Sequence, residues 1–265
     1  MHPVIYRFPT VHLFGKAFSP TIYSYGLMLT LTFVVGATLT YFELRRKNMP
    51  EDVVPPITMI GVIAGIIGAK VFAGLEDWDR FMKQLEHPLR WVLRGSGLSY
   101  LGGFVFATVG TYLYLRARKV PFLSFCDAVA PGLMIGYGIA RIGCQLAGDG
   151  DYGIPSDLPW AMAYPNGTVP TLERVHPTPV YETLASFALF GWLWAIRKKE
   201  RPPGSLFFMY LIASSISRFL VEFIRRNPKW LLGLSQSQLI SLFLISVALF
   251  GLYRNRQLAA QARSG

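Results

Sequence analysis

Seven long apolar segments constrain this chain more than any other feature. Each is long and apolar enough to cross the roughly 30 Å of hydrocarbon in a bilayer, although two of them carry charges. The chain is 52% hydrophobic, and its 15% of charged residues lies well below the roughly 25% of a soluble domain. The pattern therefore predicts an all-α, polytopic integral membrane protein of about seven transmembrane helices. The predicted spans are residues 21–42, 56–75, 99–115, 120–140, 178–196, 204–224 and 230–253.

No boundary divides the chain, so we predict a single membrane domain over residues 1–265. Its largest external loop is expected at 147–177. A short basic tail, 254–265, is expected to be cytoplasmic, solvated and disordered. Residues 76–94 mix aromatic and charged side chains, which is typical either of a helix lying in the membrane interface or of an ordinary surface loop.

The charge distribution predicts both the orientation and the kind of partner. The formal net charge is +11, which in a membrane protein favours contact with anionic membrane lipid and not with nucleic acid. Thirteen lysines and arginines lie in the loops after the odd-numbered spans, against ten, mostly balanced by acids, on the opposite side. The positive-inside rule then places the N-terminus outside and the C-terminus in the cytoplasm.

The segment 138–153, GIARIGCQLAGDGDYG, follows the fourth predicted span. Arg141 ends an apolar run, where a charge is costly unless it faces water, a partner or a ligand. The glycines that follow allow positive φ angles and close backbone approach, which suits a loop around a headgroup or an ion. A flexible interhelical loop beside a snorkelling arginine is the alternative. The four glycines are at positions 143, 148, 150 and 153.

Five further ionisable residues fall within predicted spans, where they are functional candidates by default. Arg218 and Glu222 are four residues apart on one helix, so they share a face and are expected to pair. Such a pair can also be purely structural. The five are Lys70, Asp127, Glu182, Arg218 and Glu222.

These strings resemble motifs of the prolipoprotein diacylglyceryl transferase family. Arg141, Gly143 and Gly153 match the signature R-[LI]-G-N-F-[IL]-N-x-E-x-[WY]-G, with one residue inserted before the final glycine. Cys144 stands where the family has asparagine. Either Asp149 or Asp151 must replace the glutamate of the signature.

Further motifs follow in the order of the family and extend the resemblance from Tyr25 to about Tyr253. They are Tyr25 in the first span, Gly68-Ala69-Lys70 for G-A-R, Ser99-Tyr100-Leu101-Gly102-Gly103 for S-[FM]-H-G-G, His176-Pro-Thr-Pro-Val-Tyr181-Glu182 for H-P-[ST]-Q-L-Y-E, Arg218 to Arg225 for R-F-x-x-E-F-x-R, and Gln238 at the family's glutamine before the last span.

The resemblance implies an enzyme of the bacterial cytoplasmic (inner) membrane. The family moves the diacylglyceryl group of phosphatidylglycerol onto the lipobox cysteine thiol in the signal peptide of a prolipoprotein, and glycerol 1-phosphate leaves. On this basis Arg141 and Arg218 should face one shared cavity and stabilise the leaving phosphate. The expected substrate-binding residues are Tyr25, Lys70, Tyr100, Gly102, Gly103, Gly143, Cys144, Asp149, Asp151, Gly153, Tyr181 and Glu182; the expected catalytic residues are Arg141, Arg218, His176 and Glu222.

The histidine of the S-[FM]-H-G-G motif is replaced by Leu101, which can neither take nor give a proton. Because the attacking thiol must become a thiolate, another group has to accept its proton. His176 is the most suitable by its unperturbed pKa. We therefore expect His176→Ala to abolish transfer and Leu101→His to be tolerated or to raise activity. The alternative bases are Asp149, Asp151, Glu182 and Glu222.

The missing histidine also leaves other functions open. One is a non-catalytic, lipid- or lipopeptide-binding member of the same fold, and another is headgroup transfer to a different acceptor. No cofactor and no metal are expected, because no metal-binding or phosphate-loop signature is present. A metal site built from Asp149, Asp151 and His176 is conceivable.

Overall fold

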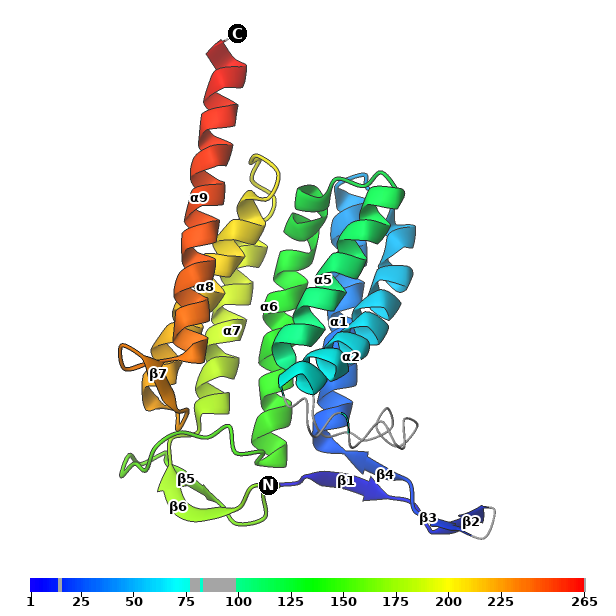
Figure 1. Ribbon diagram of the computed structural model, residues 1–265, viewed down its shortest axis with the longest axis vertical. Helices are drawn as coiled ribbons and strands as arrows, with labels where there is room; N and C mark the ends of the chain where they lie inside the picture. Colours follow the sequence, from blue (N-terminus) through cyan, green and yellow to red (C-terminus); the bar gives the residue numbers. More distant parts are fainter. Residues whose placement is uncertain (14–15, 77–81, 83–98, 265) are drawn as a thin grey trace. The chain divides into compact units, whose positions relative to one another are not determined.

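The computed structural model describes residues 1–13, 16–76, 82 and 99–264. In this part of the chain, long helices lie at the positions of all seven predicted spans, joined by loops and short strands (Figure 1). The helices are α1 (Ser24–Arg46), α2 (Val54–Glu76), α5 (Tyr100–Ala117), α6 (Phe122–Ala147), α7 (Thr178–Ile196), α8 (Ser205–Val221) and α9 (Gln236–Ser264).

Five helical segments of the described chain are long and apolar enough to cross a membrane. The other two helices, α5 and α7, are shorter and less apolar: α5 contains tyrosines and threonines, and α7 begins with the polar string TPVYET. The predicted helices are therefore confirmed, whereas the count of seven spans is not. The five are Ser24–Arg46, Glu51–Leu75, Phe122–Ala147, Ser205–Ile224 and Gln236–Leu258.

The helix boundaries differ from the predicted spans in two places. Helix α6 continues beyond residue 140, where the predicted span ends, to Ala147, so the first part of the glycine-rich segment 138–153 is helical. Helix α9 begins at Gln236 and not at residue 230. It also continues through the basic tail to Ser264, because alanine, glutamine and arginine are good helix formers, so the prediction of a disordered tail was wrong. The predicted interfacial helix at 76–94 lies almost entirely outside the described residues.

The chain divides into two compact units, Met1–Thr40 with Cys126–Gly265 and Tyr41–Phe125. The second unit is built on α2 and α5, which cross at two glycines. A Cβ atom on Gly68 would lie 2.3 Å from the carbonyl oxygen of Gly102, and a Cβ on Gly102 would lie 2.2 Å from that of Gly68. Gly65 and Gly68 of α2 make this contact with α5, as small residues allow, whereas nothing lies within 4 Å of a Cβ added at Gly61.

The first unit contains most of α1 and α6 together with α7, α8 and α9. Met134 of α6, Leu193 of α7 and Leu206 of α8 form a buried apolar cluster. At one end of this bundle the buried Asp127 accepts hydrogen bonds from the backbone N–H groups of Gly204 (2.7 Å) and Phe207 (2.8 Å). These N–H groups belong to the first turn of α8, so Asp127 caps that helix and has a structural role.

Short antiparallel strand pairs, which the sequence did not predict, precede α1 and lie in the connections from α6 to α7 and from α8 to α9. The hairpin β7–β8 links α8 to α9 through the short 3₁₀ turn η2 (Glu222–Ile224), and another 3₁₀ turn, η1 (Glu51–Val53), precedes α2. The pairs are β1 (Val4–Arg7) with β4 (Thr21–Tyr23), β2 (Val11–Leu13) with β3 (Lys16–Phe18), β5 (Met162–Tyr164) with β6 (Thr171–Val175), and β7 (Lys229–Leu231) with β8 (Leu234–Ser235).

Candidate active site

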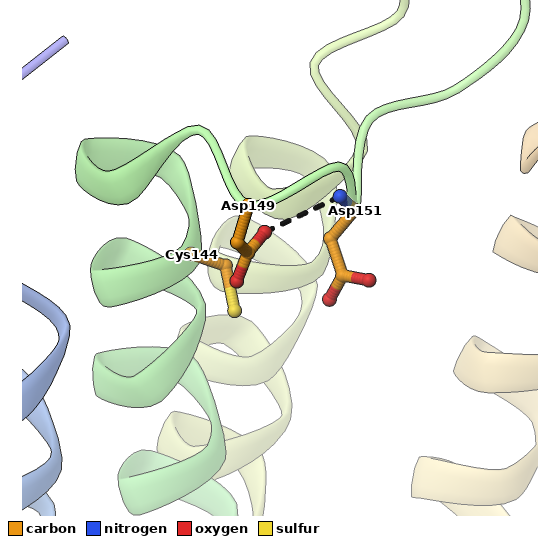
Figure 2. Close-up of side chains that lie close together, drawn as sticks. All are labelled: Cys144, Asp149 and Asp151. Carbon is orange, nitrogen blue, oxygen red and sulfur yellow. Dashed lines mark hydrogen bonds between the residues drawn. The ribbon is translucent and has the colours of Figure 1, made fainter. Parts of the chain in front are cut away.

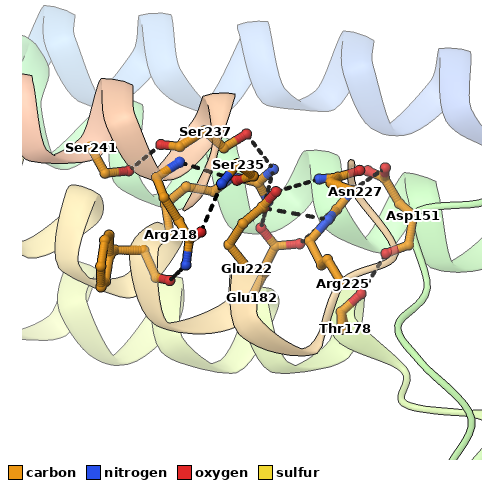
Figure 3. A network of polar contacts seen from close by, with 12 residues as sticks. Asp151, Thr178, Glu182, Arg218, Glu222, Arg225, Asn227, Ser235, Ser237 and Ser241 are labelled. Carbon is orange, nitrogen blue, oxygen red and sulfur yellow. Dashed lines mark hydrogen bonds and ion pairs between the residues drawn. The ribbon is translucent and has the colours of Figure 1, made fainter. Parts of the chain in front are cut away.

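Five segments of the first unit place their polar side chains at one end of its helices. They are the last turns of α6, the loop 148–153 that follows it, the first turns of α7, the end of α8 with η2, and the start of α9. In Figure 1 the hairpins β5–β6 and β7–β8 of this unit lie at the same end. The side chains form a continuous network of ion pairs and hydrogen bonds, most of which Figure 3 shows.

Glu182 is the centre of this network, and its side chain is almost completely buried. Its Oε2 atom lies 3.4 Å from Nε of Arg141 and 3.1 Å from Nη1 of Arg225. Its Oε1 atom lies 2.9 Å from Nη1 of Arg218 and also accepts a hydrogen bond from the hydroxyl of Tyr137. Three arginines from separate segments therefore converge on one carboxylate, which brings Arg141 and Arg218 together as predicted.

Two further carboxylates complete the network. Asp151 pairs with Arg141 through one oxygen and with Arg225 through the other, and its backbone carbonyl accepts a hydrogen bond from Thr178. Burial alone would raise the pKa of Asp151, but the guanidinium groups of Arg141 and Arg225 hold this pKa below its ordinary value. Asp151 is therefore ionised at neutral pH.

The predicted pair of Arg218 and Glu222 is confirmed: Oε2 of Glu222, the first residue of η2, lies 3.0 Å from Nη2 of Arg218 on α8. The other carboxylate oxygen of Glu222 accepts a hydrogen bond of 2.6 Å from the amide of Asn227. Nη2 of Arg218 also donates to the hydroxyl of Ser237, at the start of α9. The buried Gln238 stabilises the entry to α9, because its Oε1 atom accepts from the backbone N–H of Ser235.

The three arginines differ in how accessible they are. The side chains of Arg141 and Arg218 are 16% and 23% exposed, whereas that of Arg225 is 6% exposed. Three guanidinium groups face three carboxylates, so the network carries no net formal charge. An anion that binds here would meet arginines that are already paired with carboxylates. Of the three arginines, only Arg141 and Arg218 are exposed enough to contact it.

Sequence reasoning missed Tyr137 and gave no role to Arg225. Tyr137 lies one helical turn before Arg141 on α6, and the Cζ atom of Arg141 lies 4.9 Å from the centre of its ring. Its hydroxyl binds Glu182, so one tyrosine contacts both members of the Arg141–Glu182 pair. The spacing of four residues from Arg141 was the signal that could have revealed it.

The glycines after α6 act in two ways. Gly148 and Gly150 have φ angles of 58° and 92°, which confirms the predicted positive φ at these two positions. Gly153 is required by close approach, because a Cβ on it would lie 2.4 Å from the carbonyl oxygen of Ile224. Gly143 is helical and packs against α1, where a Cβ would lie 3.0 Å from Met28 and 3.3 Å from the ring of Tyr25. The structure thus brings Tyr25 and Gly143 together.

Cys144, Asp149 and Asp151 lie side by side where α6 ends (Figure 2). Their Sγ and carboxylate oxygen atoms all lie within 4.8 Å of one another, and the backbone N–H of Asp151 donates to Asp149. Burial raises the pKa of Asp149, the negative charge of Asp151 adds to this, and a hydrogen bond with Cys144 opposes it. These atoms could hold a metal ion, but the carboxylate of Asp151 is already bound by two arginines, and His176 is not part of the cluster.

His176 lies at the end of β6, outside the arginine network. Its Nδ1 atom lies 3.2 Å from the hydroxyl of Tyr181, which also accepts a hydrogen bond of 2.8 Å from the indole of Trp160. The backbone carbonyl of His176 accepts a hydrogen bond from the backbone N–H of Gly153, so His176 is next to the loop 148–153.

The remaining predicted residues belong to the second unit. Gly102 and Gly103 pack against α2, where a Cβ on Gly103 would lie 3.0 Å from the carbonyl oxygen of Gly65. Lys70 is buried on α2. Tyr100 and Leu101 lie in the first turn of α5, and their side chains are outside the described part of the structure.

The fold and site together define a multi-pass helical membrane protein with an arginine–carboxylate site at one end of a helix bundle. Comparison with known proteins identifies the family to which the chain belongs. The family model of prolipoprotein diacylglyceryl transferase matches residues 14–254, and the chain belongs to this family.

Curated relatives cover nearly the whole chain. The phosphatidylglycerol–prolipoprotein diacylglyceryl transferase of Clostridium tetani is 32% identical over 253 residues, which is 94% of this chain and 96% of the relative. Transferase 2 of Clostridium perfringens is 31% identical, covering 95% of this chain and 97% of the relative. The transferase of Prochlorococcus marinus (strain NATL1A) is 31% identical over 87% of this chain and 86% of its own.

Proposed function

We propose that this protein transfers the diacylglyceryl group of phosphatidylglycerol to the lipobox cysteine of a prolipoprotein signal peptide. The names of the curated relatives support this reaction. One observation in the structure carries the proposal: three arginines converge on Glu182, and two of them are partly accessible. We further propose that the protein acts in the bacterial cytoplasmic membrane with its N-terminus outside, as the basic loops predict.

The reaction places specific demands on the site. The cysteine thiolate attacks the glyceryl carbon that carries the phosphate, a carbon–sulfur bond forms and the carbon–oxygen bond breaks. The electron pair of the broken bond moves to the phosphate oxygen, and glycerol 1-phosphate leaves. Fixed cations next to this oxygen stabilise the transition state most strongly where water is excluded.

The exposed fractions of the three arginine side chains indicate which of them contact the phosphate. Arg141 and Arg218 are the groups that contact the phosphate, since each keeps part of its guanidinium open. Arg225 is buried between Asp151, Glu182 and Glu222, so it positions these carboxylates without reaching the lipid. Tyr137 is a second positioning residue, because it contacts Arg141 and Glu182 together.

The same contacts narrow the choice of base. Glu182, Glu222 and Asp151 each form ion pairs with arginine, so their oxygen atoms are already occupied and are poorly placed to take a proton from the thiol. Two groups remain among the predicted bases. His176 carries an imidazole, which can accept a proton, and it lies next to the loop 148–153. Asp149 has a pKa raised by burial. It lies in the loop 148–153, next to Cys144 near the end of α6.

The test measures transfer of labelled diacylglycerol from phosphatidylglycerol to a lipobox peptide by purified variants. Arg141→Lys and Arg218→Lys keep the charge but lose the planar fork, so each should lower kcat/KM by about 100-fold. His176→Ala should abolish transfer if His176 is the base. Arg118→Lys is the matched control, because Arg118 forms an exposed pair with Asp52, and it should leave transfer unchanged.

An alternative outcome would favour a different function. If the unaltered protein binds phosphatidylglycerol but transfers nothing, the loss of the family histidine at Leu101 has left a lipid-binding protein of the same fold. Transfer activity that is absent from the unaltered protein and created by Leu101→His would point to the same conclusion. Full activity in His176→Ala would move the role of base to Asp149.

A further inference from the structure

The hairpin β7–β8 presents three consecutive apolar side chains to its surroundings. Trp230, Leu231 and Leu232 are 70%, 61% and 88% exposed, and Leu232 stands at the tip of the turn. Exposing side chains of this size to water costs free energy in proportion to their apolar area. A contiguous exposed apolar patch therefore indicates a surface that contacts something other than water.

The backbone at the tip adds a second cost. Leu232 and Gly233 have φ angles of 54° and 74°, so both are in the left-handed region. Two-residue hairpin turns of this kind strongly favour Asn-Gly or Asp-Gly, and a leucine in the left-handed region is strained. If position 232 faced water, asparagine would be more favourable there than leucine, because it is polar and because it adopts the left-handed region more readily. A leucine is favourable there only when apolar surroundings compensate for the strain.

The position of the hairpin identifies those surroundings. It joins two candidate membrane spans, Ser205–Ile224 and Gln236–Leu258. The last turns of the first span expose Leu220 and Phe223, and the second span exposes Phe243, so the apolar surface of the hairpin continues the surface that two spans present to lipid. The ammonium group of Lys229 lies 5.9 Å from the ring centre of Phe223, as expected of a lysine at the headgroup level.

We propose that the β7–β8 hairpin inserts its tip, Trp230 to Leu232, into the interface of an anionic bilayer. Trp230 lies at the level where tryptophan is enriched in membrane proteins, Leu231 and Leu232 reach the acyl chains, and Lys229 contacts lipid phosphates. The two ends of the hairpin carry Asn227 and Ser235, which belong to the polar network. If the proposed function is correct, the inserted hairpin fixes the depth of the arginines relative to the phosphates of the bilayer.

The insertion is tested by attaching an environment-sensitive fluorophore to a single introduced cysteine. The native Cys126 and Cys144 are both buried, so introduced exposed cysteines react selectively. Leu232→Cys is compared in nanodiscs of equal parts phosphatidylcholine and phosphatidylglycerol with two reference sites. Phe243→Cys marks the lipid-facing side of a span, and Asn166→Cys marks an exposed polar turn.

Insertion predicts that spin-labelled lipids quench the label at position 232 as they quench the label at 243, and that aqueous iodide does not. Quenching by iodide as strong as at position 166, with none by the lipid quencher, overturns the proposal. This measurement needs no substrate turnover, so its failure leaves the proposed reaction untouched.

A second variant separates membrane contact from hairpin folding. Leu232→Asn suits the left-handed turn better than leucine, so it should preserve or raise the thermal stability of the protein in detergent. In nanodiscs, however, lipid quenching of a label at Leu231→Cys should fall several-fold when Leu232→Asn is added. Unchanged lipid quenching in this double variant would show that the tip does not draw the hairpin into the bilayer.

Discussion

The two compact units each contain a different kind of close contact between helices. In the second unit, α2 and α5 approach so closely at Gly68 and Gly102 that no side chain fits between the backbones, and the atoms nearest to this contact are backbone carbonyls and phenylalanine side chains. In the first unit, α6, α7 and the end of α8 are joined by three arginines and three carboxylates. Steric contact of the first kind depends on shape alone. A charge network of the second kind responds to any anion, proton or substitution that alters its balance.

This contrast explains why the reactive chemistry is assigned to the first unit. Glycine contacts offer nothing that could bind a phosphate or move a proton, whereas the network concentrates cations where the accessible Arg141 and Arg218 can exchange partners.

The largest effect is expected from Glu182→Gln. The variant leaves three buried or partly buried guanidinium groups around a neutral amide, which should cost roughly 3–5 kcal/mol and abolish transfer. Thermal unfolding in nanodiscs and the transfer assay measure the two losses. Glu173→Gln is the matched control, because Glu173 pairs with Arg226 on the surface. Equal unfolding temperatures for the two variants would contradict the central role of Glu182.

Gly102→Ala should destabilise the second unit by about 1–3 kcal/mol, because the new Cβ would lie 2.2 Å from the carbonyl oxygen of Gly68. The loss should not vary with salt or pH, unlike that of Glu182→Gln. Gly61→Ala on α2 is the control, because nothing lies within 4 Å of a Cβ added at Gly61. It should be neutral or stabilise the helix by up to about 1 kcal/mol. A loss in Gly61→Ala as large as that in Gly102→Ala would refute the steric account.

The pH dependence of transfer distinguishes the two remaining bases. A base must be unprotonated, so the rate should rise with pH through the pKa of the group that acts. For Asp149 that rise lies above the ordinary range of aspartate, because burial raises its pKa, and Asp149→Asn should remove it. A rise near neutrality that His176→Ala removes would assign the role to His176 instead. If the parent profile survives in both variants, neither group is the base.

The network should also lose stability in acid. The pKa of Asp151 is lowered in the folded protein, so its contribution is present above the unfolded value of about 4 and disappears as the pH falls through the folded value. The α2–α5 contact contains no such group. Unfolding of Asp151→Asn that follows the same acid profile as the parent would rule out this contribution.

The smallest effect is expected from Tyr137→Phe. The variant keeps the ring beside Arg141 and removes only the hydroxyl that binds Glu182, a loss of about 1 kcal/mol, or about five-fold in kcat/KM for phosphatidylglycerol. Tyr137→Leu, which removes both contacts, should lose more. Because Tyr137 is proposed to position Arg141, the loss should exceed any change in thermal stability. A fall in stability with unchanged kcat/KM would make the tyrosine purely structural.

Much of the fold followed from the sequence because its signals are local. Apolar runs long enough to span hydrocarbon located all seven helices, and the residues 178–196 coincide with α7. Local signals were weaker at the helix ends. Nothing in the apolar pattern showed that α6 continues past Arg141 to Ala147, since the glycines there are equally typical of a loop.

The sequence also determined the family, because several ordered motifs identify a common fold even where single residues differ. It determined that Arg218 and Glu222 share a helical face, since a spacing of four is a property of the helix itself. Only the tertiary structure decided that Glu182 joins Arg141, Arg218 and Arg225, that Tyr137 completes this contact, and that Asp127 caps α8. These contacts bring together residues from separate helices, and their distances depend on how the helices pack, which no local pattern in the chain encodes.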